Sequence, residues 1–197
     1  MMIDWTDYID KTNGYNPSQL LMRMEYMLQS LDGLHVLDCG CGAGNDLAFL
    51  IQKGAMVSGF DASRYAIDIC GKRLSHQANH IIRLEHASFE DFDYHRYDVV
   101  VCNSSLYFCK EVSFEQVWRK ITHSIVLGGL FCGTLLGNED GWNNFEFDTT
   151  SFKKPEVFTL FSDFEILLFE ERNKDGFSSN GQAKHWHSFH VIAKKIK

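Results

Sequence analysis

The sequence predicts a doubly wound α/β domain whose mostly parallel, seven-stranded sheet ends in a C-terminal antiparallel hairpin. Segments with strand-like and helix-like patterns alternate along the first two thirds of the chain. The strand-like segments are almost continuously apolar, as parallel strands are when helices cover both faces of their sheet. The last two have no helix between them, so they are expected to pair antiparallel.

Length and composition indicate one packed globular domain. The 197 residues are enough for a single domain and leave little for a second. Hydrophobic residues make up 45% of the chain, charged residues 23%, and there are only 2 prolines, which excludes disordered, collagen-like and linker-rich classes. We therefore expect residues 1–197 to form one domain.

The first half of the chain is expected to begin its regular structure with a helix. Asn16 is the expected N-cap, Pro17 suits the first helical position, and Gly33 is expected to end the segment. Apolar residues between them recur at spacings of three and four, which gives the helix one buried face. The segments that follow predict strands at 35–38, 56–60 and 81–85 and helices at 46–53 and 63–76.

The second half continues the alternation and then changes character. It predicts strands at 97–102 and 128–136, helices at 114–124 and 155–161, and the hairpin strands at 164–169 and 188–196. The connection at 170–187 is rich in Gly, Ser, Asn and Lys and has no helical pattern. Parallel neighbours need a crossover helix, so this connection favours a hairpin.

Charge and hydropathy exclude several classes of partner. The net charge of −7 disfavours nucleic acid, whose binding depends on neutralising phosphates. The start of the chain lacks the basic and apolar regions of a signal peptide. The longest apolar stretch, Ile125–Leu136, is interrupted by glycines and is too short to cross a bilayer. We expect a cytoplasmic protein with no membrane or nucleic-acid partner.

The six cysteines are expected to be reduced and buried. Most lie inside apolar, strand-like runs, where thiols behave as small hydrophobic side chains. Cys39 and Cys41 form a C-x-C pair, but no second pair follows at zinc-ligand spacing, so no metal is expected.

A glycine-rich turn, Asp38-Cys39-Gly40-Cys41-Gly42-Ala43-Gly44, follows the first predicted strand. Glycines there let the backbone turn tightly and approach a ligand near a helix N-terminus. The dinucleotide fingerprint G-x-G-x-x-G is not met, since its third glycine position falls on Asn45 or Leu47. A nucleotide-cofactor oxidoreductase is therefore a less favoured alternative.

This turn resembles the D-x-G-x-G-x-G motif of the class I S-adenosylmethionine (SAM) dependent methyltransferases, in particular the small single-domain type that includes tellurite-resistance proteins. The resemblance implies a Rossmann-like methyltransferase fold with SAM as cofactor. In that family the acid, here Asp38, faces the methionine amino group. The residues that would line the methionine and ribose side are Gly40, Cys41, Gly42 and Gly44.

Two further positions fit the same resemblance. Asp61, with Ala62 after it, ends the second predicted strand, where a carboxylate can accept bonds from both ribose hydroxyls; the alternative is an ordinary turn or helix cap. After the third strand, Ser88 and Phe89 occupy the positions that hold the adenine. Asp is common at the first of these in the family, so Ser88 is a departure, and its bond to the adenine amino group is a weaker expectation.

The resemblance also extends to both sides of this central region. Asn103 and Ser104 follow the fourth strand. In the family, the chain leaving this strand passes beside the methyl group that is transferred, so these two residues are candidates to contact SAM or the acceptor. The alternative is that they are ordinary polar residues at the end of a strand. Tyr8 and Tyr15, with Trp5, resemble an aromatic lead-in that folds over the cofactor, and could equally fill the core. The implied division is a lead-in at 1–32, a cofactor-binding half at 33–136 and an acceptor side at 137–197.

The function that the resemblance implies is methyl transfer from SAM by in-line displacement. A small-molecule acceptor is expected, because the chain leaves no room for a separate domain that recognises the acceptor. Topology places His187 at the sheet edge where ligands bind, as a candidate general base with His185 and Asp140 in support; the alternative is a structural role. A non-catalytic SAM-binding domain stays open. A metal hydrolase built on His185, His187 and His190 is less favoured, since no acidic or Cys ligand lies at short spacing.

Overall fold

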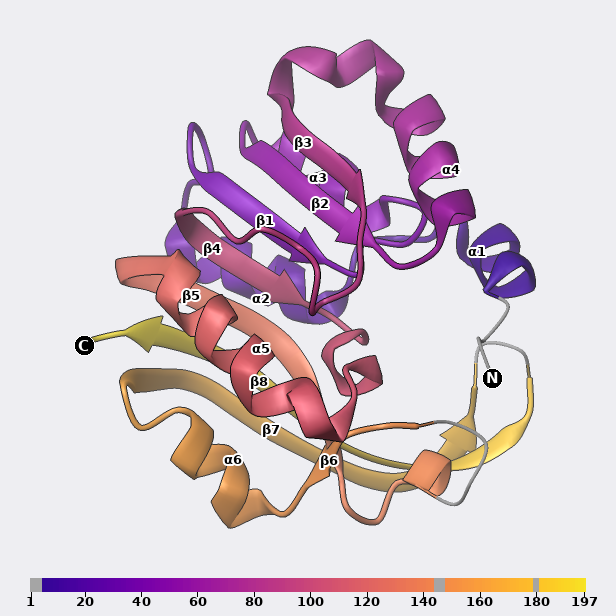
Figure 1. Ribbon diagram of the computed structural model, residues 1–197, viewed down its shortest axis with the longest axis vertical. Coiled ribbons are helices and arrows are strands. Elements are labelled where there is room, and N and C mark those ends of the chain that lie inside the picture. The colour runs from indigo at the N-terminus through magenta and orange to yellow at the C-terminus, as the bar shows by residue number, and fades with distance from the viewer. Residues whose placement is uncertain (1–4, 144–147, 179–180) are drawn as a thin grey trace.

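The computed structural model describes residues 5–143, 148–178 and 181–197. Its centre is an eight-stranded sheet in the order β3-β2-β1-β4-β5-β8-β7, with the two-residue β6 paired to β5 (Figure 1). The strands are β1 (His35–Cys39), β2 (Met56–Asp61), β3 (Ile81–His86), β4 (Tyr97–Cys102), β5 (Ile125–Gly137), β6 (Ser151–Phe152), β7 (Phe164–Phe177) and β8 (Ala183–Lys195). The predicted α/β fold is confirmed.

The helices fill the expected connections. They are α1 (Thr6–Thr12), α2 (Gln19–Leu28), α3 (Asn45–Gln52), α4 (Arg64–Leu74), α5 (Glu111–Ser124) and α6 (Lys154–Leu160). Figure 1 shows α5 on one face of the sheet and α2 and α3 on the other. The neighbouring strands β3, β2, β1, β4 and β5 all run parallel, so their carboxyl ends meet at one edge of the sheet.

The C-terminal hairpin is antiparallel as predicted, but it is much longer. β8 pairs antiparallel with both β5 and β7. The prediction that strand structure is absent from most of 170–187 was wrong, because β7 continues to Phe177 and β8 begins at Ala183. β7 is the edge strand and is largely exposed, so its polar composition is that of a solvated ribbon.

Two boundaries near the N-terminus also differ from the prediction. Ser18, not Asn16, caps α2, because its hydroxyl accepts a 3.0 Å hydrogen bond from the Leu21 N–H. The helix ends at Leu28 with Gln29 in the left-handed region at φ 64°, well before Gly33. Helix α1 was not predicted, because its single buried face is too short to show a periodic pattern.

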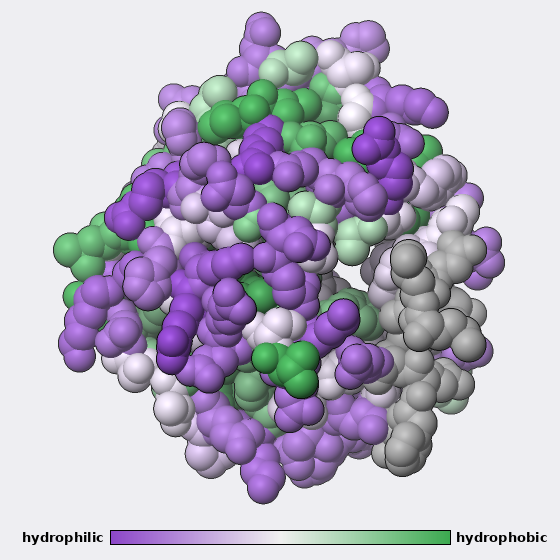
Figure 2. Space-filling model, in the orientation of Figure 1, coloured by the Kyte–Doolittle hydropathy of each residue, from purple (hydrophilic) through white to green (hydrophobic). Residues whose placement is uncertain are grey.

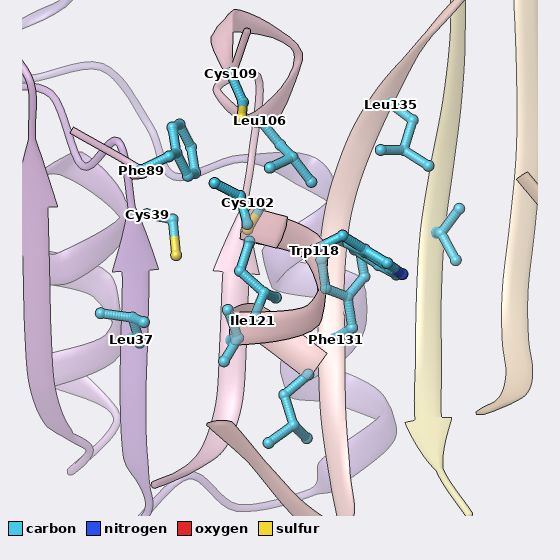
Figure 3. Close-up of a cluster of buried hydrophobic side chains, with 14 of the residues drawn as sticks. Leu37, Cys39, Phe89, Cys102, Leu106, Cys109, Trp118, Ile121, Phe131 and Leu135 are labelled. Atoms are coloured by element: carbon cyan, nitrogen blue, oxygen red, sulfur yellow. The ribbon is translucent and has the colours of Figure 1, made fainter. Parts of the chain in front are cut away.

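Side chains from successive strand residues form hydrophobic clusters on opposite faces of the sheet. Leu37 and Val100 belong to the cluster under α5, whereas Val36 and Val99 belong to the cluster under α2, α3 and α4. Figure 3 shows the first cluster, with Trp118 of α5 close to Phe131 of β5. Their ring centroids lie 5.2 Å apart in an edge-to-face contact. These two layers fix the strand ends that carry the polar residues.

The face of the molecule in Figure 2 is mostly hydrophilic, with hydrophobic residues in small separate groups. Among the residues the structure describes, no helix is both long enough and apolar enough to cross a membrane.

Gly44 offers a test of how tightly the first turn is packed. It caps α3 at φ 78°, and a Cβ there would lie 2.5 Å from the Cys70 sulfur of α4. We expect Gly44→Ala to lower the free energy of unfolding by about 2–5 kcal/mol, the sum of left-handed strain and overpacking. Urea denaturation measures the loss.

Gly33→Ala is the matched control for that substitution. Gly33 has a similar φ of 72°, but a Cβ would meet no atom within 4 Å. Only the strain, about 1–2 kcal/mol, is expected there. Equal losses in the two variants would show that α4 does not press on Gly44.

Candidate functional site

A pocket of about 340 Å³ opens at the carboxyl edge of the parallel strands. Residues that follow β1, β2, β3 and β4 form its floor, and the N-terminal segment with α1 forms one wall. Its lining comprises Trp5, Tyr8, Ile9, Thr12, Tyr15, Asn16, Ser18, Asp38, Gly40, Cys41, Gly42, Ala43, Asn45, Asp46, Phe60, Asp61, Ala62, Ala87, Ser88, Phe89, Glu90, Asn103, Ser104, Ser105 and Phe108.

The glycine turn shapes the floor of this pocket. Gly40 and Cys41 donate their N–H groups to the Phe60 carbonyl at 2.8 and 3.0 Å, which ties the turn to β2. Gly40 has φ 74°, and a Cβ there would lie 2.5 Å from the Ser105 Cβ. Gly42 has φ 53° and open space within 4 Å of where a Cβ would stand. A ligand can therefore approach the backbone at Gly42.

Asp38 lies at the end of β1 and is only 3% exposed. Burial raises the pKa of its carboxyl well above the usual range, and the nearby Asp46, Cys70 and Asp61 raise it further. A carboxyl in this position is stabilised as an anion when a cation lies next to it. It is thus a specific place for a positively charged ligand group.

Asp46, in the first turn of α3, joins three segments at the pocket wall. One carboxylate oxygen accepts from the Ser18 N–H at 2.8 Å, and the other accepts from the Asn103 amide at 3.2 Å. Burial raises the pKa of Asp46, while these hydrogen bonds lower it by a smaller amount. The contacts hold the start of α2 and the exit of β4 on the same side of the pocket.

Asp61 is held at the end of β2 by two backbone donors. The N–H groups of Gly42 and Ser63 bind its two oxygens at 2.9 and 2.8 Å. Burial raises its pKa, and the two hydrogen bonds oppose that shift. Each carboxylate oxygen has a second lone pair, so Asp61 can still accept hydrogen bonds from a ligand.

Ser88 and Phe89 lie beyond β3 at the same edge. The Ser88 hydroxyl donates to the Asp91 carboxylate at 2.7 Å and accepts from the Asp91 N–H at 3.2 Å. The Phe89 ring is buried edge-to-face against Phe60, with centroids 5.3 Å apart. This part of the pocket has one flat apolar wall and one hydroxyl already used in a turn.

Aromatic side chains of the N-terminal segment and the region after β4 also line the pocket. Trp5 packs edge-to-face against Phe108, with centroids 4.8 Å apart, and against Tyr8 at 5.7 Å. Trp142 lies behind Phe108 at 5.7 Å. Burial, followed by the proximity of Asp61, raises the pKa of the Tyr8 hydroxyl, so that hydroxyl stays neutral at ordinary pH.

Every predicted cofactor-binding residue lines the pocket except Gly44, which packs on α4. The part of the cofactor that each residue would contact stays a prediction. Sequence reasoning did not select Asp46 or Glu90, although both line the pocket. The signal for Asp46 was its place in the first helical turn after the glycines.

The three predicted catalytic residues lie outside the pocket lining. The His187 ring is buried against Gly137, with Nε2 3.2 Å from Glu171 and Nδ1 accepting from the Glu139 N–H at 3.1 Å. The His185 ring nitrogens each lie 2.7 Å from a partner, Asp175 or Asn173. The catalytic role of this group stays a prediction.

Asp140, the third of these residues, is a buried connector. Its carboxylate accepts the N–H groups of His187 and Trp142, each at 2.9 Å, and pairs with the Lys184 ammonium. Within the ranges that the structure describes, no group of three His, Cys, Asp or Glu side chains is arranged to hold a metal ion. All six cysteines are buried and unpaired with one another.

Comparisons with known proteins agree with this geometry. Residues 36–129 match the family model of a methyltransferase domain. A ubiquinone biosynthesis O-methyltransferase of Coxiella burnetii is 33% identical over 101 residues, which cover 49% of this chain and 43% of that protein. One of Actinobacillus pleuropneumoniae is 28% identical over 109 residues, covering 49% and 46%. The chain spans less than half the length of these curated relatives.

Two solved structures share the fold over nearly the whole chain. TehB from Haemophilus influenzae superposes with a TM-score of 0.78 at 17% identity, covering 96% of this chain and 66% of that one. The Burkholderia thailandensis 1,6-didemethyltoxoflavin-N1-methyltransferase superposes with a TM-score of 0.73 at 15% identity, covering 98% and 82%. That structure contains bound S-adenosylhomocysteine.

The chain thus has a Rossmann-like α/β fold, and its residues 36–129 are similar to a methyltransferase domain. The resemblance to the class I SAM-dependent methyltransferases is confirmed by this domain match together with the curated relatives and the shared fold.

The buried carboxyl of Asp38 predicts a pH-dependent loss of stability. Its pKa is raised in the folded protein, so the folded state holds a proton that the unfolded state releases above about pH 4. The free energy of unfolding therefore falls as pH rises from about 4 through the folded pKa. We expect Asp38→Asn to remove this loss and raise the melting temperature at pH 7.5 by several degrees, about 2–4 °C per kcal/mol.

Thermal unfolding of ligand-free protein at pH 5 and 7.5 measures this effect. The stabilisation by Asp38→Asn is expected to be larger at pH 7.5 than at pH 5. The exposed Asp32 provides the control, and Asp32→Asn is expected to change nothing at either pH. A lower melting temperature for Asp38→Asn at pH 7.5 would contradict the assigned shift.

Proposed function

We propose that the protein transfers a methyl group from SAM to a small-molecule acceptor by in-line displacement. The observation that carries the proposal is the pocket at the glycine turn, where Asp38 and Asp61 are two of several carboxyls and no basic side chain lies among the described lining residues. SAM carries a sulfonium and an ammonium group, so the charge of the site fits it.

The residues of the pocket fit each part of that cofactor. Asp38 would accept hydrogen bonds from the ammonium group, and Asp61 would accept hydrogen bonds from the ribose hydroxyls. The open space above Gly42 leaves room for the methionine chain, and a Cβ there would reduce it. Phe89 offers a flat apolar face for the adenine, whereas the Ser88 hydroxyl is engaged with Asp91.

Catalysis in this proposal rests on positioning. When bound, SAM supplies a methyl group on a sulfonium, whose C–S electron pair returns to sulfur on displacement. The protein holds the two reactants in line, which can supply much of the rate without a nucleophilic side chain. Trp5, Tyr8 and Phe108 would line the space that the acceptor occupies. Asn103, held by Asp46, would set the β4 side of the site.

A small-molecule acceptor is supported by the relatives. The curated ones are named for ubiquinone biosynthesis, and a structural neighbour for a toxoflavin precursor. The rival is a protein that binds SAM without transferring its methyl group. Formation of S-adenosylhomocysteine in the presence of an acceptor supports transfer, whereas tight SAM binding with no product across a broad acceptor panel would overturn it.

We also propose that the protein works in the cytoplasm and without a nucleic-acid partner. Six unpaired, buried thiols suit a reducing compartment. The net charge of −7 disfavours contact with phosphate backbones.

Asp61 provides the sharpest test of cofactor binding. Asp61→Ala removes the acceptor for the ribose hydroxyls, so SAM is expected to bind about 10 to 150 times more weakly, equivalent to about 1.5–3 kcal/mol. Isothermal titration calorimetry measures the affinity. Asp68→Ala, on the exposed side of α4 beside Arg64, is the control and should bind SAM normally. Wild-type affinity in Asp61→Ala would remove the ribose role.

A further inference from the structure

The acidic residues of the pocket outnumber what the cofactor needs. Asp38, Asp46, Asp61 and Glu90 all line it, and no Lys, Arg or His does so among the described residues. The residues at 1–4, 144–147 and 179–180 include no basic type either. SAM brings two positive groups and one carboxylate, a net charge of +1. The lining therefore offers more carboxyl groups than the cofactor would engage, and no basic side chain among the described residues.

The basic side chains near the pocket lie outside its lining. The Lys120 ammonium donates to the Glu90 backbone carbonyl at 2.7 Å, and Lys110 is close enough to lower the pKa of the Glu90 carboxyl, so Glu90 is partly compensated. The others are directed to partners of their own. Arg73 donates to the side-chain oxygen of Asn45, and His86 contacts the Ala62 carbonyl at 3.1 Å. The Lys184 side chain is 5% exposed, and its ammonium pairs with Asp140. It also lies over the rings of Trp142 and Trp186, at 4.4 and 3.6 Å from their centroids. Its charge is balanced where it lies, so it does not serve the pocket.

Part of the pocket lining is aromatic. Trp5 contacts both Tyr8 and Phe108 edge-to-face, and all three line the pocket. Aromatic faces carry partial negative charge, so they attract cations and stack with neutral rings. A carboxylate or phosphate placed there would face these rings and the acidic side chains without a counter-ion.

We propose that the methyl acceptor is a planar aromatic compound that is neutral or cationic, with an N–H or O–H as the methylated group, and that acceptors bearing a carboxylate or phosphate are rejected. This inference rests on the proposed function, because it assigns the acceptor of the same site. On transfer, the new C–N or C–O bond forms as the C–S bond breaks, and the acceptor proton passes to water.

Asp46 is the residue that sets this selectivity. It is partly buried and lies on the Asn103 side of the pocket, where it accepts hydrogen bonds from Ser18 and from the Asn103 amide. No salt bridge to a described residue neutralises it, so its anion would act on a ligand near the β4 exit. Asp46→Asn has nearly the same shape and keeps an oxygen that can accept from Ser18.

The test uses three phenols of matched shape that differ in side-chain charge: 4-methylphenol, tyramine and 4-hydroxyphenylacetate. Calorimetry first measures S-adenosylhomocysteine binding, which reports the proposed function alone. Each phenol is then titrated into the S-adenosylhomocysteine-saturated protein. We expect the neutral and cationic phenols to bind at least about tenfold more tightly than the anion. Equal or tighter binding of the anion, or no binding of any phenol, would overturn the proposed acceptor class.

The same titrations on Asp46→Asn test the cause. The preference for tyramine over 4-hydroxyphenylacetate is expected to fall by about tenfold, roughly the effect of one unit charge near the ligand. Asp68→Asn, an exposed position on α4, is the matched control and should keep the wild-type preference. An unchanged preference in Asp46→Asn would show that this carboxylate does not select the acceptor.

Discussion

The buried carboxyl of Asp38 is the constraint on which the rest of the site depends. A carboxylate that loses its water costs free energy unless a cation or several donors compensate. In the glycine turn that follows, the Gly40 and Cys41 N–H groups donate to the Phe60 carbonyl and the Gly42 N–H donates to Asp61. Asp46 and Asp61 add like charge nearby, which raises the cost further. The ligand-free protein therefore holds a carboxyl that favours its protonated form, and a cationic ligand beside it would stabilise the anion.

Most of the fold could be predicted because several of the parallel strands are short apolar runs that end in polar or glycine residues. β1 and β4, for example, are buried along almost their whole length. The hairpin was harder. β7 is exposed at the sheet edge, so its residues alternate little and resemble a loop in composition. The predicted N-cap of α2 was wrong for a local reason: Ser18 can cap a helix in the same way as Asn16 and lies two residues further along the chain.

The site was predictable where a motif and a strand end coincide, as at Asp38 and Asp61. It was not predictable where contacts join distant segments. Asp46 gains its place from Ser18 and Asn103, which lie 28 and 57 residues away in the chain. Topology correctly brings His187 to the carboxyl edge, but β8 lies beyond β5, and the ring packs against Gly137 outside the pocket lining.

The exchange of protons on SAM binding tests most directly whether these carboxyls form the cofactor site. Binding enthalpies measured at pH 6 in two buffers of different ionisation enthalpy report that exchange. Because the pKa of Asp38 is raised in the free protein, an arriving cation lowers it, and net proton release to the buffer is expected. Proton uptake, or equal enthalpies in the two buffers, would contradict binding of the cationic cofactor at Asp38.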